Sequence, residues 1–489
     1  MQLHDLLRRF DPASNLNGVA NPLLSGIADD SRTVQPGGLF VARMGTKTDG
    51  ATFVAQAVQN GAAAVVSASA LPGMGVPVIV IPDIGERLSA LANAFYDSPS
   101  GALRVLGITG TNGKTTSAYL VRHILSNVGK KCGMIGTVEI DDGQTRRESD
   151  LTTPGALATI QLLASMRKNK CVAAVMETSS HALDQGRVAG VSFAGAAFTN
   201  LTGDHLDYHR TMDAYADAKA KLFESLEESS VAVVNRADAW SSRMTRGCRA
   251  KVVTFGFTAD ADYRAADVAV TSHGSNFVLH TPDGEAEVRI GLIGRHNVEN
   301  ALTAAALVGE AMGLSVHQIA QALADANGAP GRLQQVRAGQ AFAVLVDYAH
   351  TDDALKNVLT ALRPLTRGKL RVLFGCGGDR DRTKRPRMAA TAQALADVVY
   401  ITSDNPRKEQ PMDIIEEIRA GITRDADEVH VEPDRRRAID RIIQEAGEND
   451  VVLLAGKGHE NYQIVGTTKH HFDDVEEATR AVGDALAGV

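Results

Sequence analysis

A glycine-rich turn near residue 110 carries the residue types that bind a nucleotide phosphate. It reads Gly110-Thr111-Asn112-Gly113-Lys114-Thr115-Thr116. Glycines let backbone N–H groups close around phosphate, and the N-terminus of a following helix favours negative charge. Lys114 can reach the β- and γ-phosphates of ATP, and the Thr115 hydroxyl can bind Mg²⁺. Ile108 stands where the general pattern has its first glycine, but the Gly-Lys-Thr core still favours an ATP site over a chance turn.

The elements around this turn must hold it rigidly. Residues 103–109 form a short apolar run that predicts a buried strand, and 115–127 follow as a helix. Further strand-like runs at 172–176, 194–198 and 231–235 alternate with helical patterns. Such alternation indicates a parallel sheet covered by helices on both faces. Residues 262–293 read instead as an antiparallel meander with a turn at Pro282-Asp283-Gly284.

Two clusters of turn residues, at 97–101 and 327–331, divide the chain of 489 residues. We therefore expect an α/β protein of three domains, spanning 1–100, 101–330 and 331–489. The first is a mixed α/β domain, and the second is a parallel-sheet domain like that of P-loop ATPases. In the third, strands predicted at 342–346, 370–374, 398–402, 429–431 and 451–455 indicate a Rossmann-like, doubly wound sheet.

Composition excludes several classes of protein. A net charge of −7 and 4% aromatic residues argue against a general nucleic-acid binder. The four cysteines form no CxxC pair, which argues against a zinc site or a disulfide framework, and three of them lie in or beside apolar runs that predict burial. Neither a signal peptide nor a run long enough to span a bilayer is found. We expect a cytoplasmic protein without membrane insertion, and a monomer.

Motifs spread along the chain resemble those of the Mur ligase family, which includes folylpolyglutamate synthetase. After the phosphate turn come Glu177-Thr178-Ser179-Ser180-His181, Asp204-His205-Leu206-Asp207-Tyr208-His209, His296-Asn297, Gly331-Arg332 and Asp347-Tyr348-Ala349-His350. Within the family, the chain resembles the members that add diaminopimelate. The markers are Gly377-Gly378-Asp379-Arg380-Asp381-Arg382, Asp404-Asn405-Pro406-Arg407 and Gly456-Lys457-Gly458-His459-Glu460. The resemblance covers essentially the whole chain and implies the family's three domains.

The resemblance implies catalytic and metal-binding roles for five residues. Lys114 binds the phosphates, while Glu177 and Thr115 hold Mg²⁺ and His205 lies at a second Mg²⁺. Without the family match, Glu177 reads as an exposed charge or a cap, and His205 as part of a solvated loop. Lys219 looks like a surface lysine on an amphipathic helix, but the matching lysine in related enzymes is carbamylated. A carbamate is an anion that can assist Mg²⁺ beside phosphates, which an ammonium cannot.

The remaining site residues also follow from the resemblance. Those implicated in binding a UDP-linked muramyl dipeptide are Ser31, Thr152, Thr153, Ser179, Gln185 and Arg187. Hydroxyls and an arginine suit a pyrophosphate and a sugar acid, although Ser31 is otherwise equally well read as the cap of a turn. Those implicated in contacts to the adenine, ribose or phosphates of ATP are Asn297, Arg332, Asp347 and His350.

Diaminopimelate differs from lysine by a carboxylate at its far stereocentre. The residues that resemble the family's contacts to it are Arg380, Asp404, Asn405, Pro406, Arg407, Gly456 and Glu460. The guanidinium of Arg407 can bind a carboxylate through two parallel hydrogen bonds. Its motif follows the strand predicted at 398–402, and ligands of doubly wound sheets lie beyond such strand ends. Read alone, the tetrapeptide is only a turn with a solvated charge.

Together these expectations describe an ATP- and Mg²⁺-dependent ligase. The resemblance implies that it joins meso-diaminopimelate to the D-glutamyl γ-carboxylate of UDP-N-acetylmuramoyl-L-alanyl-D-glutamate through an acyl phosphate, in peptidoglycan precursor synthesis. Three alternatives stay open: a lysine-adding version of this ligase, another family member such as folylpolyglutamate synthetase, and a P-loop ATPase without ligase activity. The last leaves the C-terminal motifs without a role.

Overall fold

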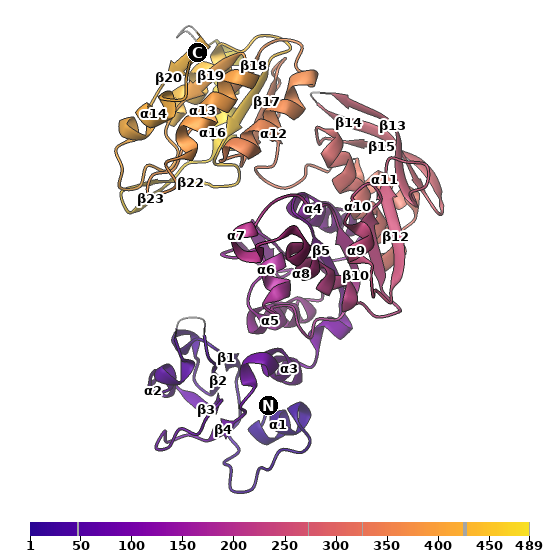
Figure 1. Cartoon of the computed structure of the whole chain (residues 1–489), viewed down its shortest axis with the longest axis vertical. Coiled ribbons are helices and arrows are strands. Elements are labelled where there is room, and N and C mark those ends of the chain that lie inside the picture. The colour runs from indigo at the N-terminus through magenta and orange to yellow at the C-terminus, as the bar shows by residue number, and fades with distance from the viewer. Residues whose placement is uncertain (46–47, 272, 325, 424–427, 489) are drawn as a thin grey trace. The chain divides into compact units, whose positions relative to one another are not determined.

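The computed structural model describes residues 1–45, 48–271, 273–324, 326–423 and 428–488. The chain forms two compact units (Figure 1). The first contains Met1–Phe255 and Thr303–Leu314, and the second contains Gly256–Leu302 and Ser315–Val489. The division into segments at residues 100 and 330 stays a prediction.

The first unit begins with a small four-stranded parallel sheet in the order β1-β2-β3-β4. Its β2 strand, Gly38–Ala42, is buried along its whole length. Leu39 and Val41 enter one hydrophobic cluster, while Phe40 and Ala42 enter another. Because both faces are covered, the strand is apolar throughout, as is usual for parallel sheets. The other elements are α1 (Leu3–Phe10), β1 (Ile27–Ala28), α2 (Val54–Gln59), β3 (Ala62–Ser67), β4 (Val78–Val80) and α3 (Ile84–Tyr96).

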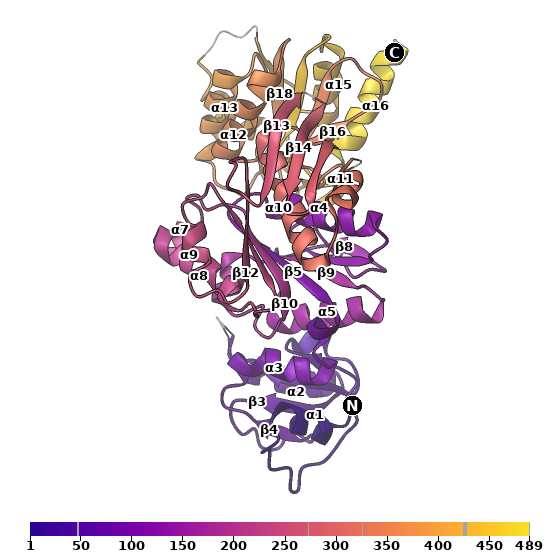
Figure 2. The same ribbon diagram turned by 90° about the vertical axis from the view of Figure 1, so that its right-hand side faces the viewer.

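A second sheet of the first unit has the strand order β12-β11-β10-β5-β9-β6-β7-β8. From β12 to β6 all neighbours are parallel, and β7 and β8 add an antiparallel edge. Figure 2 shows β10, β5 and β9 side by side. The strands are β5 (Arg104–Thr109), β6 (Cys132–Ile135), β7 (Glu139–Asp141), β8 (Arg146–Glu148), β9 (Ala173–Glu177), β10 (Phe193–Phe198), β11 (Val231–Asn235) and β12 (Lys251–Gly256). The helices are α4 (Lys114–Asn127), α5 (Ala156–Lys168), α6 (Ser180–Asp184), α7 (Leu206–His209), α8 (Met212–Glu224) and α9 (Ser241–Met244).

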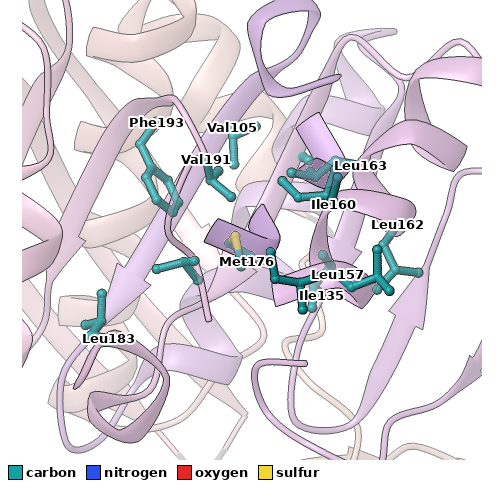
Figure 3. Packing of buried hydrophobic residues seen from close by; sticks show 14 of the residues in the cluster. Val105, Ile135, Leu157, Ile160, Leu162, Leu163, Met176, Leu183, Val191 and Phe193 are labelled. Carbon is teal, nitrogen blue, oxygen red and sulfur yellow. The ribbon is translucent and has the colours of Figure 1, made fainter. Parts of the chain in front are cut away.

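The core beneath β9 fixes the end of that strand. Met176, one residue before the predicted metal ligand Glu177, is fully buried beside Ile135, Leu157 and Ile160 (Figure 3). Leu157 and Ile160 lie three residues apart on α5, the spacing that brings two side chains to one helix face. Each such side chain contributes roughly 1.5–3 kcal/mol by leaving water. The packing of Met176 therefore fixes the position of the Glu177 backbone.

The second unit contains an antiparallel meander and a six-stranded sheet. The meander comprises β13 (Tyr263–Thr271), β14 (Gly274–Thr281) and β15 (Gly284–Ile290), with the predicted turn between β14 and β15. The strand order of the six-stranded sheet is β16-β17-β21-β18-β19-β20, and only the edge strand β16 is antiparallel. Its strands are β16 (Gln334–Val336), β17 (Ala343–Asp347), β18 (Leu370–Phe374), β19 (Val398–Ile401), β20 (Val429–Val431) and β21 (Val451–Ala455).

Helices cover both faces of this sheet, which confirms the doubly wound fold. Figure 2 shows α12 and α13 on one side of β18, and α15 and α16 on the other. Alternate strand residues enter two clusters, one with α12, α13 and α14 and one with α15 and α16. The helices of this unit are α10 (Arg295–Met312, which ends in the first unit), α11 (Val316–Leu323), α12 (Asp352–Leu362), α13 (Lys384–Leu395), α14 (Pro411–Arg419), α15 (Arg435–Gln444) and α16 (Asp474–Ala487), and a hairpin is formed by β22 (Tyr462–Val465) and β23 (Thr468–His471).

Two further expectations can be compared with the structure. Cys132, Cys171 and Cys376 are buried free thiols, as predicted. Among the described residues, no helix is both long and apolar enough to cross a membrane.

Candidate functional site

The phosphate loop joins β5 to α4, as the sequence predicts. Gly110 and Gly113 have φ values of +148° and +86°, which side chains other than glycine rarely adopt. A Cβ atom at Gly110 would collide with the Thr199 hydroxyl. The chain after β10 holds the loop, because the Asn200 carbonyl accepts from the Thr111 N–H at 2.8 Å and the Asn200 side chain accepts from the Asn112 N–H at 3.0 Å. The loop is therefore fixed in shape by a neighbouring strand end.

Two lysines donate to the same loop carbonyl. Lys114 Nζ lies 2.9 Å from the Gly110 oxygen and 2.8 Å from that of Thr111. Lys219, on α8, also donates to the Gly110 oxygen at 2.9 Å. The interpretation of Lys219 as a surface lysine is wrong, since only 1% of it is exposed. Burial, together with repulsion from Lys114, holds the pKa of Lys219 well below its usual value.

Glu177 connects β9 to the start of α4. Its side chain is buried and accepts from the Thr115 hydroxyl at 2.9 Å. Thr137 donates twice to the same carboxylate, from its N–H at 2.8 Å and its hydroxyl at 3.0 Å. Thr116, the last residue of the predicted loop motif, is buried in the first turn of α4. A hydroxyl and a carboxylate in contact at a helix N-terminus are oxygen donors of the kind that Mg²⁺ prefers.

Five of the six residues predicted to bind the muramyl peptide form one network beside Glu177. Thr153 donates to the Glu177 carbonyl at 2.8 Å and accepts from the Ser179 N–H at 3.0 Å. Arg187 donates to the Thr153 carbonyl at 3.1 Å and to the Gln185 side chain at 2.6 Å. Thr152 joins through its hydroxyl, 3.1 Å from that of Thr137.

Ser31, the sixth residue, lies apart from that network. It begins a short 3-10 helix after β1 in the small sheet, and its hydroxyl donates to the Gln56 side chain at 2.9 Å. Asp30 caps this turn and forms an ion pair with Arg32. Within the described ranges, no hydrogen bond joins Ser31 to the network around Thr153.

His205 stands among aromatic side chains near Lys219. Its φ of +53° is unusual for a residue with a side chain. Its ring centre lies 4.9 Å from that of His181 and 6.2 Å from that of Tyr215. Lys219 also contacts Tyr215, with its Nζ 4.5 Å from the centre of the Tyr215 ring. Tyr215 thus lies near two of the predicted metal-site residues, His205 and Lys219.

The predicted nucleotide contacts of the second unit meet around Tyr348. Asp347, at the end of β17, accepts from the N–H groups of Leu333 and Ala349 at 2.8 and 2.9 Å, and burial raises the pKa of Asp347. The Arg332 guanidinium lies 5.4 Å from the Tyr348 ring centre, and the His350 ring lies 4.6 Å from it. A flat ring beside a cation and a buried carboxylate can contact a base and a ribose.

Two more residues of the second unit, Asn297 and His459, are held in place by local contacts. Asn297 is buried near the start of α10 and donates to the Ile293 carbonyl at 2.8 Å. Asn297 lies in the first turn of that helix, and its side chain donates to a carbonyl instead of accepting from a backbone N–H as an N-cap would. His459 packs its ring 4.9 Å from Tyr348, and burial, followed by the charge of Arg332, lowers the pKa of His459 to about 4.

Loops after three adjacent strands, β21, β18 and β19, hold the predicted diaminopimelate contacts. Asn405 donates to the Glu460 carboxylate at 2.8 Å, which joins the loops after β19 and β21. Arg407, with φ +50°, donates to the Gly378 carbonyl at 3.0 Å, which joins the loops after β19 and β18. Burial raises the pKa of Glu460, and the nearby Asp404 adds to this effect.

Glycines allow these loops to approach one another. A Cβ atom at Gly456, whose φ is +113°, would lie 2.9 Å from an Asp404 carboxylate oxygen. A Cβ atom at Gly377 would lie 2.8 Å from Arg407 Nη1 and 3.7 Å from the Arg380 side chain, and one at Gly378 would collide with the Pro406 carbonyl. All seven predicted residues therefore lie on the three loops.

Comparison with known proteins matches most of the chain to one family. Three family models match: "Mur ligase family, catalytic domain" over residues 24–96, "Mur ligase middle domain" over 108–308, and "Mur ligase, glutamate ligase domain" over 331–458. The chain belongs to the Mur ligase family.

Curated relatives of this Mur ligase match it from end to end. A protein of Gloeobacter violaceus is 44% identical over 486 residues, covering 99% of the chain and 98% of the relative. One of Thermosynechococcus vestitus is 45% identical over 495 residues, covering 99% of both. Both are named UDP-N-acetylmuramoyl-L-alanyl-D-glutamate–2,6-diaminopimelate ligase.

Solved structures give the same fold. A structure named for that same diaminopimelate ligase is 36% identical, with a TM-score of 0.72, and covers 98% of this chain and 99% of its own. A MurF ligase from Thermotoga maritima in complex with ADP has a TM-score of 0.65, covering 95% of this chain and 99% of that one. At 17% identity, the second likeness concerns the fold alone.

Sequence reasoning missed several residues of this Mur ligase site. Thr137 follows β6, and its position at the carboxyl end of a parallel strand was the available signal. Asn200 and Tyr215 contact the phosphate loop through Asn112 and Thr111, and only the fold brings them there. Lys457 is fully buried and lies 3.6 Å from Glu460, although lysine is the residue type least expected inside.

Proposed function

We propose that this Mur ligase is an ATP-dependent enzyme that joins meso-diaminopimelate to the D-glutamyl γ-carboxylate of UDP-N-acetylmuramoyl-L-alanyl-D-glutamate. The observation that carries the proposal is the set of loops after β21, β18 and β19, which gather Arg407, Asn405, Asp404 and Glu460. The names and full-length identity of the relatives support it. We place the reaction in the cytoplasm, and we propose a monomer that requires neither nucleic acid nor membrane.

The reaction must first activate a carboxylate, which is a poor electrophile because oxide cannot leave. Transfer of the γ-phosphoryl group of ATP to the substrate carboxylate yields an acyl phosphate and ADP. The loop N–H groups and the N-terminus of α4 bind the phosphates, and Lys114 moves from the loop carbonyls to them. Since little covalent chemistry falls to the protein, positioning and charge neutralisation account for most of the catalysis.

The residues beside the phosphate loop fit Mg²⁺. Thr115 and Glu177 would hold the ion, which supplies positive charge to the phosphate oxygens. The described residues contain no group of three or more His, Cys, Asp or Glu suited to a metal, and Mg²⁺ bound with a nucleotide needs only one or two carboxylates besides phosphates and water. Thr137 orients the Glu177 carboxylate through two hydrogen bonds.

Lys219 is a suitable site for carbamylation. Burial lowers the pKa of Lys219, which favours the neutral amine, the nucleophilic form of lysine. Attack of that amine on carbon dioxide forms an N–C bond and releases one proton, giving an anionic carbamate. The change places a negative charge beside the Lys114 ammonium, so the two side chains then attract each other. Beside His205, the new anion would serve a second Mg²⁺.

Selection of the amino acid falls to the second unit. Diaminopimelate brings a distal carboxylate and a distal ammonium. The Arg407 guanidinium is suited to the carboxylate, and Asp404 and Glu460 supply negative charge for the ammonium. The free α-amine of diaminopimelate would then attack the acyl phosphate, expelling phosphate and losing a proton to form the amide. Lysine would leave Arg407 without its partner, and a site built for a polar group can reject an analogue lacking it by about 10⁴-fold.

An amino-acid panel tests the proposal directly. Purified enzyme, ATP, Mg²⁺ and UDP-N-acetylmuramoyl-L-alanyl-D-glutamate are mixed with meso-diaminopimelate, L-lysine or no amine, and phosphate release and product mass are followed. We expect product only with meso-diaminopimelate. Equal use of L-lysine would replace this proposal by the lysine-adding activity, and phosphate release that ignores the amine would favour a simple ATPase.

A further inference from the structure

An ion pair that is completely buried lies beneath the loops after β19 and β21. Arg435 is the first residue of α15 and Asp474 is the first residue of α16, and neither is exposed to solvent. The guanidinium binds the carboxylate through two hydrogen bonds, from Nε at 2.8 Å and from Nη2 at 2.6 Å. Arg435 thereby anchors two helix starts to each other.

The same guanidinium also reaches the two loops. Its Nη1 donates to the Ser403 carbonyl at 3.3 Å, and its Nη2 donates to the Ala455 carbonyl at 3.1 Å. Ser403 immediately precedes Asp404, and Ala455 immediately precedes Gly456. Each acceptor is therefore one peptide away from a residue proposed to contact the amino acid.

Sheet topology explains why this bridge matters. Strand β18 lies between β21 and β19, so the two outer strands are about 10 Å apart. Their loops must converge past the end of β18 to reach one guanidinium. Gly375, which follows β18, permits this, since a Cβ atom there would lie 2.9 Å from the Asp404 nitrogen. Arg435 thus joins the two loops at their bases, and the bond from Asn405 to Glu460 joins them farther along.

Stability alone explains the pair poorly. A buried ion pair is often no more stabilising than apolar residues of similar size, because both ions lose their hydration. A cation in the first turn of a helix is also opposed by the helix dipole. Both terms disfavour arginine at this position unless its hydrogen bonds serve a geometric purpose.

We propose that Arg435, held by Asp474, is a positioning residue that fixes the separation of the loops 403–407 and 455–460 and so shapes the amino-acid pocket. The inference rests on the proposed function of that pocket. Arg435 does not touch the substrate, and its effect passes through the Ser403 and Ala455 carbonyls to Asp404 and Gly456. Loss of the bridge should therefore weaken use of the amino acid while leaving ATP binding intact.

The test uses full-length enzyme carrying both Arg435→Met and Asp474→Leu, which removes the ions together and leaves neither unpaired. We expect thermal unfolding close to that of the parent. The KM for meso-diaminopimelate should rise about 10- to 100-fold, since a misplacement of about 1 Å can cost about 100-fold, and the KM for ATP should change by less than about 3-fold. Arg435→Lys keeps the charge but donates through a single nitrogen, so its KM for meso-diaminopimelate should lie between those of the parent and the double variant.

Arg480→Met is the matched control. Arg480, on α16, joins the same two helices near the surface through Asp440 on α15, and it also pairs with Glu477 and Asp484 on its own helix. None of these three carboxylates belongs to the pocket loops. The control variant should leave both KM values unchanged. A folded double variant with the parental KM for meso-diaminopimelate, or with an equal rise in both KM values, would overturn the positioning role. Failure of the parent enzyme itself to use meso-diaminopimelate would instead overturn the proposed function.

Discussion

Thr137→Val removes one hydroxyl from the magnesium site. The replacement keeps the shape of the side chain and the N–H bond to Glu177, but removes the hydroxyl that donates to Glu177 at 3.0 Å and lies 3.1 Å from the Thr152 hydroxyl. A hydrogen bond to a charged group contributes about 1.5–3 kcal/mol. Glu177 is buried, so solvent does not replace the lost donor. We expect the free energy of unfolding to fall by about 1–3 kcal/mol.

Activity should respond through Mg²⁺. The Glu177 carboxylate keeps the Thr115 hydroxyl and the Thr137 N–H as donors but loses one of the bonds that orient it. The Mg²⁺ concentration for half-maximal turnover should therefore rise by about 10-fold, the usual effect of losing an outer-shell partner. Urea unfolding and a Mg²⁺ titration of phosphate release measure the two quantities.

Thr402→Val is the control for this prediction. The Thr402 hydroxyl is buried, and no hydrogen-bond partner for it is found in the described part of the chain. Its removal should leave the Mg²⁺ titration unchanged and the stability equal or higher. A Thr137→Val enzyme that matches Thr402→Val in both measurements would show that the hydroxyl does not orient Glu177.

Four further outcomes are expected. Lys114→Ala should fold normally and lower turnover by orders of magnitude, which steady-state kinetics and circular dichroism check together; near-parental turnover in a folded variant argues against its phosphate role. Lys219→Ala should be nearly inactive and partly recovered by formate or acetate; an active variant and an unmodified lysine by mass spectrometry would exclude the carbamate. Arg407→Ala should raise the KM for meso-diaminopimelate far more than that for ATP, and equal rises would contradict its assigned role. For His459, the folded pKa of about 4 lies below the ordinary value of 6.5. The unfolded state therefore binds more protons between these values, and the free energy of unfolding should fall as the pH drops from about 6.5 to about 4. Urea unfolding of His459→Gln should show a smaller dependence on pH in this range, and an unchanged dependence would assign it to other groups.

The sequence predicted best those features in which a chemical motif and its secondary structure lie in one continuous segment. The turn from Gly110 to Thr116 lies between an apolar strand and a helix, and both neighbours could be read directly. Five strands of the six-stranded sheet, β17 to β21, were predicted nearly to the residue because each is a short apolar run between turns, whereas the edge strand β16 was not predicted. The hairpin of β22 and β23 was not predicted either, and none of the residues in its two strands is buried.

Other features depend on contacts between distant segments. The pattern of α8 does not reveal that Lys219 faces the phosphate loop, 109 positions away in the chain. Thr137 and Glu177 become neighbours only because β6 and β9 are adjacent strands. Arg435 and Asp474 each begin an ordinary polar-capped helix, and only packing turns both side chains inward.

The glycines of the three pocket loops limit how amino-acid choice can be redesigned. Any side chain at Gly456 would first meet Asp404, and any side chain at Gly377 would first meet Arg407. Mutations there would deform the pocket before they enlarged it. A ligase engineered for another diamine should therefore retain the glycines and vary Arg380 first, because the Arg407 side chain also joins two of the loops through the Gly378 carbonyl.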